Sequence, residues 1–238
     1  MLYQTQGLIL HCFMHTDAKM IIKIYTKSFG TISYLDFRSS KKKHTNLFLP
    51  MSLIEFTGER KNKANFDYIK DPKILATPDP IQFDIVKSSI SMFLNEALYK
   101  LLFDAAEDGS LFDFLFSSLT RFFCQTMPAP DFHLRFLVAL MQELGSSPKD
   151  NYSSEYAVFS VEKSCFEAHP LPNKEHQMLS LYMHRLLQHD LFPDSPQDII
   201  PYPYRNPLLE LILRYYSTHI ANLSQMKSHT ILKTVLHT

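Results

Sequence analysis

The chain has 238 residues and a formal net charge of zero, with 24 Lys and Arg residues against 24 Asp and Glu residues. Its hydrophobic fraction of 45% and aromatic fraction of 13% exclude a disordered chain and predict one large folded domain or two modest ones. No segment approaches the roughly 18 to 20 uninterrupted apolar residues that a membrane-spanning helix needs, so we expect no membrane association.

The cysteines and the N-terminus are typical of a cytoplasmic protein. Cys12, Cys124 and Cys165 lie far apart and form no C-x-x-C motif, so we expect neither a disulfide framework nor a paired zinc knuckle. Residues 1–10 carry no cationic region ahead of their short apolar run, which differs from the pattern of a secretory signal.

The net charge of zero conceals a difference between two parts of the chain. Residues 1–75 carry 12 Lys and Arg against 6 Asp and Glu, a charge of +6, and residues 76–238 carry the compensating −6. A segregation of this kind predicts that the first part binds a polyanion and that the second part does not.

The first 75 residues contain short apolar runs of strand length and no sustained helical period. In the run KSFG, Gly30 is expected to adopt the positive φ of a tight turn. Short strands in this number suit a small barrel. The five predicted strands are residues 7–13, 20–25, 31–35, 51–57 and 66–70.

Both basic clusters of this part fall between predicted strands. The run RSSKKKHTNLFLP occupies residues 38–50, and the run GERKNK occupies residues 58–63. Each is therefore expected to be an inter-strand loop. The period of two in the second strand predicts a core-like face of Met20, Ile22 and Ile24, and a face of Ile21, Lys23 and Tyr25 that mixes a cation with an aromatic ring.

The pattern changes after the segment TPDP at residues 77–80, where a helical period begins. A proline-rich boundary followed by a change of period predicts two domains, residues 1–78 and residues 79–238. The predicted helices of the second domain are residues 83–106, 111–125, 131–144, 174–189, 207–220 and 228–236.

Individual residues predict how some of these helices begin and what they pair with. Asp131 and Ser228 are expected to be N-caps, and Pro207 is expected in a first turn. Glu210 and Arg214 have the spacing of an i,i+4 ion pair.

Residues 146–172 interrupt the helical pattern, and their segments 157–161 and 165–168 are expected to pair as a small hairpin. Cys165, His169 and His176 form a C-x3-H-x6-H series in or beside it. A zinc ribbon normally supplies two cysteines per knuckle, so we expect no metal there. His11 and His15 are four residues apart, but they fall on a predicted strand end and loop, and core or surface roles are favoured.

The motifs of common enzymes are missing from the sequence. It contains no G-x-S-x-G, P-loop, G-x-G-x-x-G or H-E-x-x-H motif, so no catalytic residue and no cofactor is predicted. Arg121 and Arg135 stand within strongly apolar helices and have two interpretations. Each is either an ordinary snorkelling or capped arginine, or an anchor for a partner's carboxylate beside an apolar groove.

Five segments together resemble one family, the bacterial recombination mediator RecO. They are GLIL…HTDAKMIIKIYTKSFGTISYL, the R-S-x-K-K loop leading into LFLPMSLIEF, FDIVKSSISMFLNEALYK, FLVALMQELGSSP, and LRYYSTHIANLSQMKSHTILKTVL. The resemblance covers nearly the whole chain. In the last segment, Lys227 and Ser228 occupy the positions where the family commonly starts its terminal helix.

The resemblance implies an α+β protein, with an N-terminal five-stranded OB-fold barrel followed by an all-helical domain that carries the hairpin insert. It further implies a non-enzymatic protein that binds single- and double-stranded DNA, anneals strands and works with RecR. It also implies binding to the acidic C-terminal tail of single-stranded-DNA-binding protein and assistance to RecA. Many relatives carry a four-cysteine zinc ribbon at the insert, and this chain has only Cys165 there.

If the chain binds DNA in this way, the basic residues of the barrel are expected to form a phosphate-binding surface. Tyr25, together with Tyr34 or Tyr68, is then expected to stack on bases. The relatives usually have a glycine before the loop arginine, where this chain has Asp36 and Phe37. A protein-binding scaffold and an RNA-binding OB-fold factor are the alternatives. The expected DNA-binding residues are Lys23, Tyr25, Lys27, Arg38, Lys41, Lys42, Lys43, Arg60, Lys61 and Lys63, and the expected tail-binding residues are Arg121 and Arg135.

Overall fold

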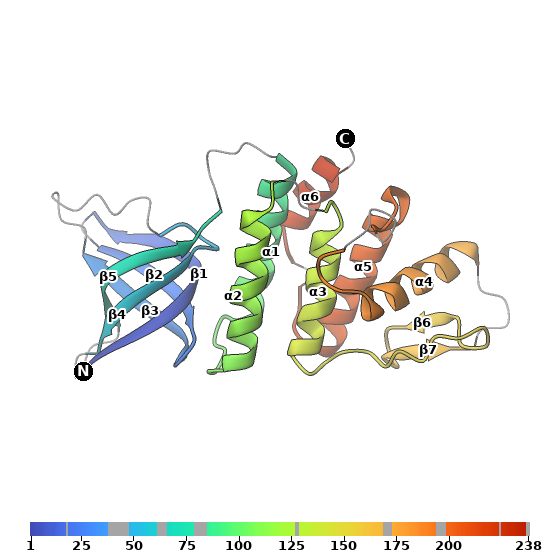
Figure 1. The fold of residues 1–238 in the computed structure, drawn as a ribbon, viewed down its shortest axis with the longest axis horizontal. Helices are drawn as coiled ribbons and strands as arrows, with labels where there is room; N and C mark the ends of the chain where they lie inside the picture. The colour runs from blue at the N-terminus through green and yellow to red at the C-terminus, as the bar shows by residue number, and fades with distance from the viewer. Residues whose placement is uncertain are drawn as a thin grey trace. The chain divides into compact units, whose positions relative to one another are not determined.

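The structure is a computed structural model. It divides into two compact units, Met1–Thr126 and Met127–Thr238, which are described separately (Figure 1). The domain boundary expected at residue 78 marks the change from strands to helices and stays a prediction, because the first compact unit also contains two helices. The structure describes residues 1–17, 19–37, 48–60, 66–78, 85–126, 129–168, 173–193, 199–223 and 225–236.

The predicted barrel is confirmed. Its strands close in the order β1-β2-β3-β5-β4, antiparallel except where β3 pairs in parallel with β5 (Figure 1). β1 is longer than its apolar run predicted, because polar residues at both ends pair with β4 and β2. The strands are β1 Leu2–Thr16, β2 Lys19–Thr26, β3 Gly30–Phe37, β4 Leu53–Glu59 and β5 Asp67–Ala76.

Strand alternation fills the barrel as the sequence predicted. Met20, Ile22 and Ile24 of β2 point inward and are almost completely buried. Tyr34 and Phe56 join them with an edge-to-face contact, their ring centroids 4.9 Å apart. The intervening residues of β2 and β3 therefore make up the outer face of the barrel, the face through which OB-folds commonly bind oligonucleotides.

Two helices complete the first unit, α1 Ile85–Leu101 and α2 Gly109–Cys124. Asp108 caps α2, since its side chain accepts a hydrogen bond from the backbone N–H of Leu111 at 3.0 Å. The buried ammonium of Lys87 joins the helices by donating to the carbonyls of Phe123 and Gln125, both at 2.8 Å. A lysine that the sequence left unassigned therefore holds the helical pair together.

The turn before β3 attaches the barrel to the segment between these helices. Gly30 has a φ of 66°, as predicted, and a Cβ there would lie 2.3 Å from the carbonyl oxygen of Ala105. Thr31 donates its backbone N–H to the same oxygen at 2.9 Å and its hydroxyl to the carbonyl of Leu102 at 2.5 Å. Glycine is needed at this position for its backbone conformation and also for the close approach of the next segment.

The second unit is built from four described helices. Tyr216 donates its buried hydroxyl to the carbonyl of Leu137 at 2.8 Å and so joins two of them. Among the described residues of the chain, none of the helices is both long enough and apolar enough to cross a membrane. The helices are α3 Phe132–Glu143, α4 Lys174–Gln188, α5 Tyr202–His219 and α6 Ser228–Leu236.

Two details of the second unit differ from the sequence predictions. Pro207 lies inside α5 and not in its first turn, because the helix already begins at Tyr202 after Pro201. Glu210 and Arg214 do not pair with each other. Glu210 pairs with Lys233 of α6, and Arg214 pairs with Glu162 at 3.0 Å, because tertiary partners outcompete a neighbour on the same helix.

The predicted hairpin is present as β6 Val158–Ser160 and β7 Cys165–Glu167. The hydroxyl of Ser180 on α4 accepts the backbone N–H of Phe159 at 2.8 Å. His184, also on α4, contacts the carboxylate of Asp150 at 2.8 Å and stacks on Tyr152 with an interplanar angle of 17°. Hydrogen bonds and ring contacts thus fix the insert to its own unit.

Candidate nucleic-acid interface

Most of the expected DNA-binding cations lie outside the described residues. Their attachment points are nevertheless defined: β3 ends at Phe37 and the chain resumes at the buried Phe48, while β4 ends at Glu59 and β5 begins at Asp67. The cations of both basic runs therefore fall between strands of the barrel, as the sequence predicted, but Gly58 and Glu59, the first residues of the second run, lie within β4. The cations outside the described residues are Arg38, Lys41, Lys42, Lys43, Lys61 and Lys63.

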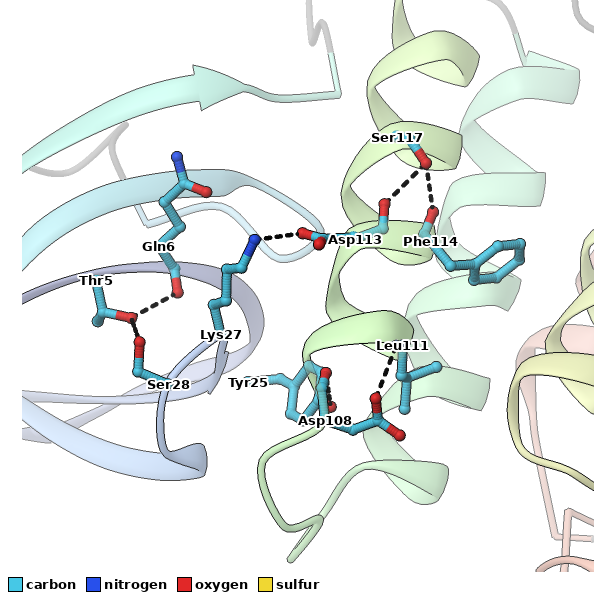
Figure 2. Close-up of polar contacts among 10 residues, drawn as sticks. All are labelled: Thr5, Gln6, Tyr25, Lys27, Ser28, Asp108, Leu111, Asp113, Phe114 and Ser117. Atoms are coloured by element: carbon cyan, nitrogen blue, oxygen red, sulfur yellow. Dashed lines mark hydrogen bonds and ion pairs between the residues drawn. The ribbon is translucent and has the colours of Figure 1, made fainter.

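Lys27, the residue that follows β2, forms an ion pair with Asp113 of α2. Its ammonium lies 2.6 Å from a carboxylate oxygen of Asp113 (Figure 2). Both side chains are well exposed, so water screens the pair and it adds little to stability. The carboxylate does lower the positive potential that Lys27 presents, and a phosphate bound there has to compete with Asp113.

Tyr25 is buried and offers no exposed ring to a base. Its hydroxyl donates to the carbonyl of Asp108 at 3.3 Å (Figure 2). The centroid of its ring lies 6.2 Å from that of Phe112. Burial, followed by the charge of Asp108, raises the pKa of Tyr25 to about 12. The period of two correctly separated Tyr25 from the barrel core, but the first unit's own helix covers this ring.

Lys23 is also covered by the segment between α1 and α2. Its side chain is only 14% exposed, and its ammonium lies 3.0 Å from the ring centroid of Phe103 and 3.6 Å from a carboxylate oxygen of Asp104. The ring of Phe103 covers the ammonium of Lys23, and the carboxylate of Asp104, which is itself largely exposed, pairs with it from the solvent side. Lys23 and Tyr25 thus belong to a covered half of the outer face, over which the chain from residue 99 to residue 113 lies.

Arg60, the described cation of the second basic run, takes part in a network at the β4–β5 end of the barrel. Its Nε donates to the carboxylate of Asp67 at 3.2 Å, and its guanidinium lies 5.9 Å from the ring centroid of Tyr3. Tyr3 donates to Asp67 at 2.6 Å and hydrogen-bonds the hydroxyl of Tyr34 at 3.0 Å. The side chain of Arg60 remains 52% exposed, so it can meet a phosphate while Asp67 holds it in place.

The same network holds Tyr34 inside the barrel, where its ring is not accessible to a base. Tyr34 is completely buried inside the barrel, where desolvation and the bond with Tyr3 raise its pKa well above the usual range. Burial raises the pKa of Tyr3 to about 12. Of the three tyrosines considered for stacking, only Tyr68 is not fully buried.

The other half of the outer face carries aromatic rings that reach solvent. Phe37 is 50% exposed, and its ring stacks on that of Tyr68 with an interplanar angle of 8° and a centroid separation of 5.5 Å. The ammonium of Lys19 lies 5.6 Å from the ring centroid of Phe37. Sequence reasoning missed Phe37 and Lys19, although the alternation of TISYLDF already places Phe37 on the same face as Leu35 and next to Arg38.

The two arginines considered for tail binding differ in accessibility. Arg135 is buried, with its Nε 3.2 Å from the carboxylate of Asp131 and an Nη donating to the carbonyl of Asp190 at 3.2 Å. Asp131 also accepts the backbone N–H of Ile200 at 2.8 Å instead of capping α3 through its side chain. Arg135 is thus a core residue that a partner's carboxylate cannot reach in this structure. Arg121 is exposed in the last turn of α2.

The residues considered for metal binding do not converge. His11 and His15 lie on β1 and not on a helix, so the four-residue spacing does not place them on one helical face. Cys165 lies on β7 and His176 on α4, and His169 is outside the described residues. Within the described parts of the chain, no three His, Cys, Asp or Glu side chains are grouped so as to hold a metal ion.

Comparison with known proteins gives concordant results along the chain. The family model described as Recombination protein O N terminal matches residues 1–78, and the model described as Recombination protein O C terminal matches residues 82–229. Similar proteins include DNA repair protein RecO of Phocaeicola vulgatus, 31% identical over 98% of both chains. DNA repair protein RecO of Azobacteroides pseudotrichonymphae is 29% identical over 99% of both chains, and that of Flavobacterium psychrophilum is 27% identical over 98% of both.

Proposed function

The chain belongs to the RecO family of DNA repair proteins, and we propose that it is a non-enzymatic, cytoplasmic recombination mediator that binds and anneals DNA strands. In this role it works with RecR and assists the loading of RecA onto single-stranded DNA coated by single-stranded-DNA-binding protein. The name of the relatives gives DNA repair as their role. Annealing and the three partner proteins are parts of the proposal.

The observation that carries the proposal is the placement of charge on the barrel. Residues 1–75 have a charge of +6, and both of their basic runs connect strands of a closed five-stranded barrel. Loops and one sheet face are the parts of an OB-fold that commonly bind oligonucleotides. A cluster of cations there binds phosphates irrespective of base sequence.

Annealing follows from this chemistry without a catalytic group. Two complementary strands repel each other through their phosphates, and a cationic surface that contacts both lowers this repulsion. Because each phosphate contact is weak and depends on salt, the strands can slide until their bases are in register. Arg60, held by Asp67 and still half exposed, fits this role as a preoriented phosphate contact.

The binding of an acidic protein tail is assigned to the first unit's exposed arginine. Arg121 is exposed in the last turn of α2, whereas Arg135 is neutralised in the core by Asp131. We therefore expect Arg121→Ala to weaken the binding of a fluorescent tail peptide. Arg121→Lys is the matched control. It retains the positive charge but not the two parallel N–H donors, so it separates the contribution of charge from that of bidentate binding. Equal binding by Arg121→Ala and the unaltered protein would reject this assignment.

The main test is fluorescence anisotropy with single-stranded DNA, duplex DNA and RNA over a series of salt concentrations. The proposal predicts binding to both forms of DNA, with affinity falling as salt rises by roughly 0.7 to 0.9 log units per log unit of salt for each phosphate contacted. Reversal of Lys41, Lys42 and Lys43 to Glu is expected to weaken binding and flatten the salt dependence. A control that reverses Lys149, Lys163 and Lys174 of the second unit in the same way is expected to leave both unchanged.

The same measurement separates the alternatives. A protein-binding scaffold predicts no DNA affinity at physiological salt, and an RNA-binding factor predicts tighter binding of RNA than of DNA with the same sequence. If the triple reversal in the first basic run left DNA affinity and its salt slope unchanged, the assignment of that run would be wrong. Annealing is measured separately, as the rate at which two complementary labelled strands combine with and without the protein.

A further inference from the structure

The end of the outer face formed by the start of β2 and the end of β3 has the composition of a base-binding site. Strand pairing places Lys19 opposite Phe37, and Leu35 opposite Tyr68. Residues directly opposite each other point to the same side of a sheet. The ring of Phe37 therefore lies between a cation and a second ring on the outside of the barrel, and half of its surface is in contact with solvent.

We propose that the stacked pair of Phe37 and Tyr68 is a platform on which an unpaired DNA base stacks, with Lys19 beside it to contact the adjoining phosphate. This inference rests on the proposed DNA binding and adds to it the residues that distinguish single strands from duplexes. An aromatic ring offers a flat surface to any base, so the platform is indifferent to base identity. Bases within a duplex are already stacked and present no free face to it.

Two further observations favour a nucleic-acid base over an apolar protein segment as the occupant. Phe37 is followed directly by Arg38 and the basic run, so the platform is covalently joined to the most cationic segment of the chain. The ammonium of Lys19 lies 5.6 Å from the centroid of the Phe37 ring, so a cation stands beside the platform. An extended polyanion with flat apolar groups between its charges matches a surface of alternating rings and cations.

The covered half of the same face shows why the platform lies at this end. Tyr25 and Lys23 are on the same outer face, but Phe112, Asp108 and Phe103 occupy the space that a nucleotide needs. Among the described outer-face residues of β2, β3 and β5, a DNA strand therefore finds an exposed ring only at Phe37 and a partly exposed ring only at Tyr68. The first unit's own helices thus restrict base stacking to one end of the barrel.

A fluorescence experiment tests the platform directly, because the protein contains no tryptophan. Phe37→Trp introduces a single reporter at the platform, and Tyr156→Trp introduces one at an exposed aromatic position of the second unit. Single-stranded oligothymidylate is expected to quench the first reporter at saturation and to leave the second unchanged. Duplex DNA is expected to quench neither, although it binds both variants.

Affinity measurements separate stacking from simple apolar contact. Phe37→Leu keeps an apolar side chain without a π face and is expected to weaken single-stranded DNA binding by roughly 5- to 100-fold. Phe37→Tyr keeps the ring and is expected to bind as the unaltered protein does. The salt slope is expected to stay the same in both, since no phosphate contact is removed, and thermal unfolding confirms that both variants fold.

The outcomes distinguish this inference from the proposed function. If anisotropy shows that the unaltered protein binds DNA while the Phe37→Trp reporter is not quenched and Phe37→Leu binds normally, the platform is wrong and the DNA-binding function stands. If the unaltered protein binds no DNA, the proposed function fails first. Equal quenching by single strands and duplexes would reject the role of the platform in telling the two apart.

Discussion

The two halves of the barrel's outer face come from the same strands and follow the same alternation, yet they end in opposite environments. At one end Tyr25 and Lys23 lie beneath the chain that connects α1 and α2, and at the other Phe37 reaches solvent beside Lys19. The covered half contributes stability, and the exposed half is the one that we propose to bind DNA bases. An aromatic residue next to a cation on an OB-fold strand is therefore insufficient to identify a stacking site.

Of the changes that test this difference between the two halves, removal of the Tyr25 ring is expected to have the largest effect on stability. Tyr25→Ala deletes a completely buried ring and should lower the free energy of unfolding by about 3 to 5 kcal/mol, without changing the DNA affinity of the protein that remains folded. The counterpart Phe37→Leu should change stability by less than about 1 kcal/mol and weaken single-stranded DNA binding. Denaturant unfolding and anisotropy on both variants check the pair. Loss of DNA affinity in the milder Tyr25→Phe would show that the covered half also binds DNA.

The second prediction concerns the turn that attaches the covered half to the helical segment. Gly30 has a φ of 66°, and the Cβ of Gly30→Ala would lie 2.3 Å from the carbonyl oxygen of Ala105. This substitution should therefore lower the free energy of unfolding by about 3 kcal/mol. Gly145→Ala has the same φ of 66° and no atom within 4 Å of the added Cβ, so it should cost only about 1 kcal/mol. Thermal unfolding of both variants measures the difference. Equal destabilisation of the two variants would show that the close approach of Ala105 to residue 30 does not contribute to the loss of stability.

The third prediction uses the titration of Tyr25. Its hydroxyl ionises near 10 in the unfolded chain and has a pKa of about 12 in the folded protein, so folding disfavours the phenolate. The stability contributed by this residue is therefore retained below pH 10 and lost as the pH rises through 12, by about 2 to 3 kcal/mol in total. Tyr25→Phe should reduce that loss in denaturant titrations at different pH values. An alkaline stability profile identical to that of the unaltered protein would assign the loss to other tyrosines.

The smallest expected effect is the release of Lys27 at the border of the covered half. Asp113→Asn removes its carboxylate partner, which lies 2.6 Å away. Single-stranded DNA should then bind about threefold more tightly, and the salt slope should steepen by up to about 0.7. Glu143→Asn, an exposed carboxylate in the second unit, is the control and should leave both unchanged. Unchanged binding in Asp113→Asn would indicate that DNA does not approach Lys27.

Much of the architecture could be predicted because its signals are local. Alternating apolar residues marked the five strands, and the pairing of residues 157–161 with 165–168 predicted the hairpin of β6 and β7. Family resemblance, carried by ordered motifs along the chain, gave the OB-fold and the DNA repair role. The errors came from single residues whose partners are distant in sequence. Arg135 donates to the backbone carbonyl of Asp190, 55 positions away, and Glu210 pairs with Lys233 of α6 instead of Arg214.

The candidate site likewise has features that the sequence predicts and features that depend on tertiary contacts. The sequence by itself determined that the basic runs connect barrel strands and that residues 1–75 carry the positive charge, since both follow from composition and strand period. Only the tertiary structure decided which outward rings are accessible. Alternation tells which side of a strand a residue is on, but whether another element covers that side depends on contacts such as those of Thr31 with Leu102 and Ala105. Those contacts join residues more than 70 positions apart, where a local pattern carries no information.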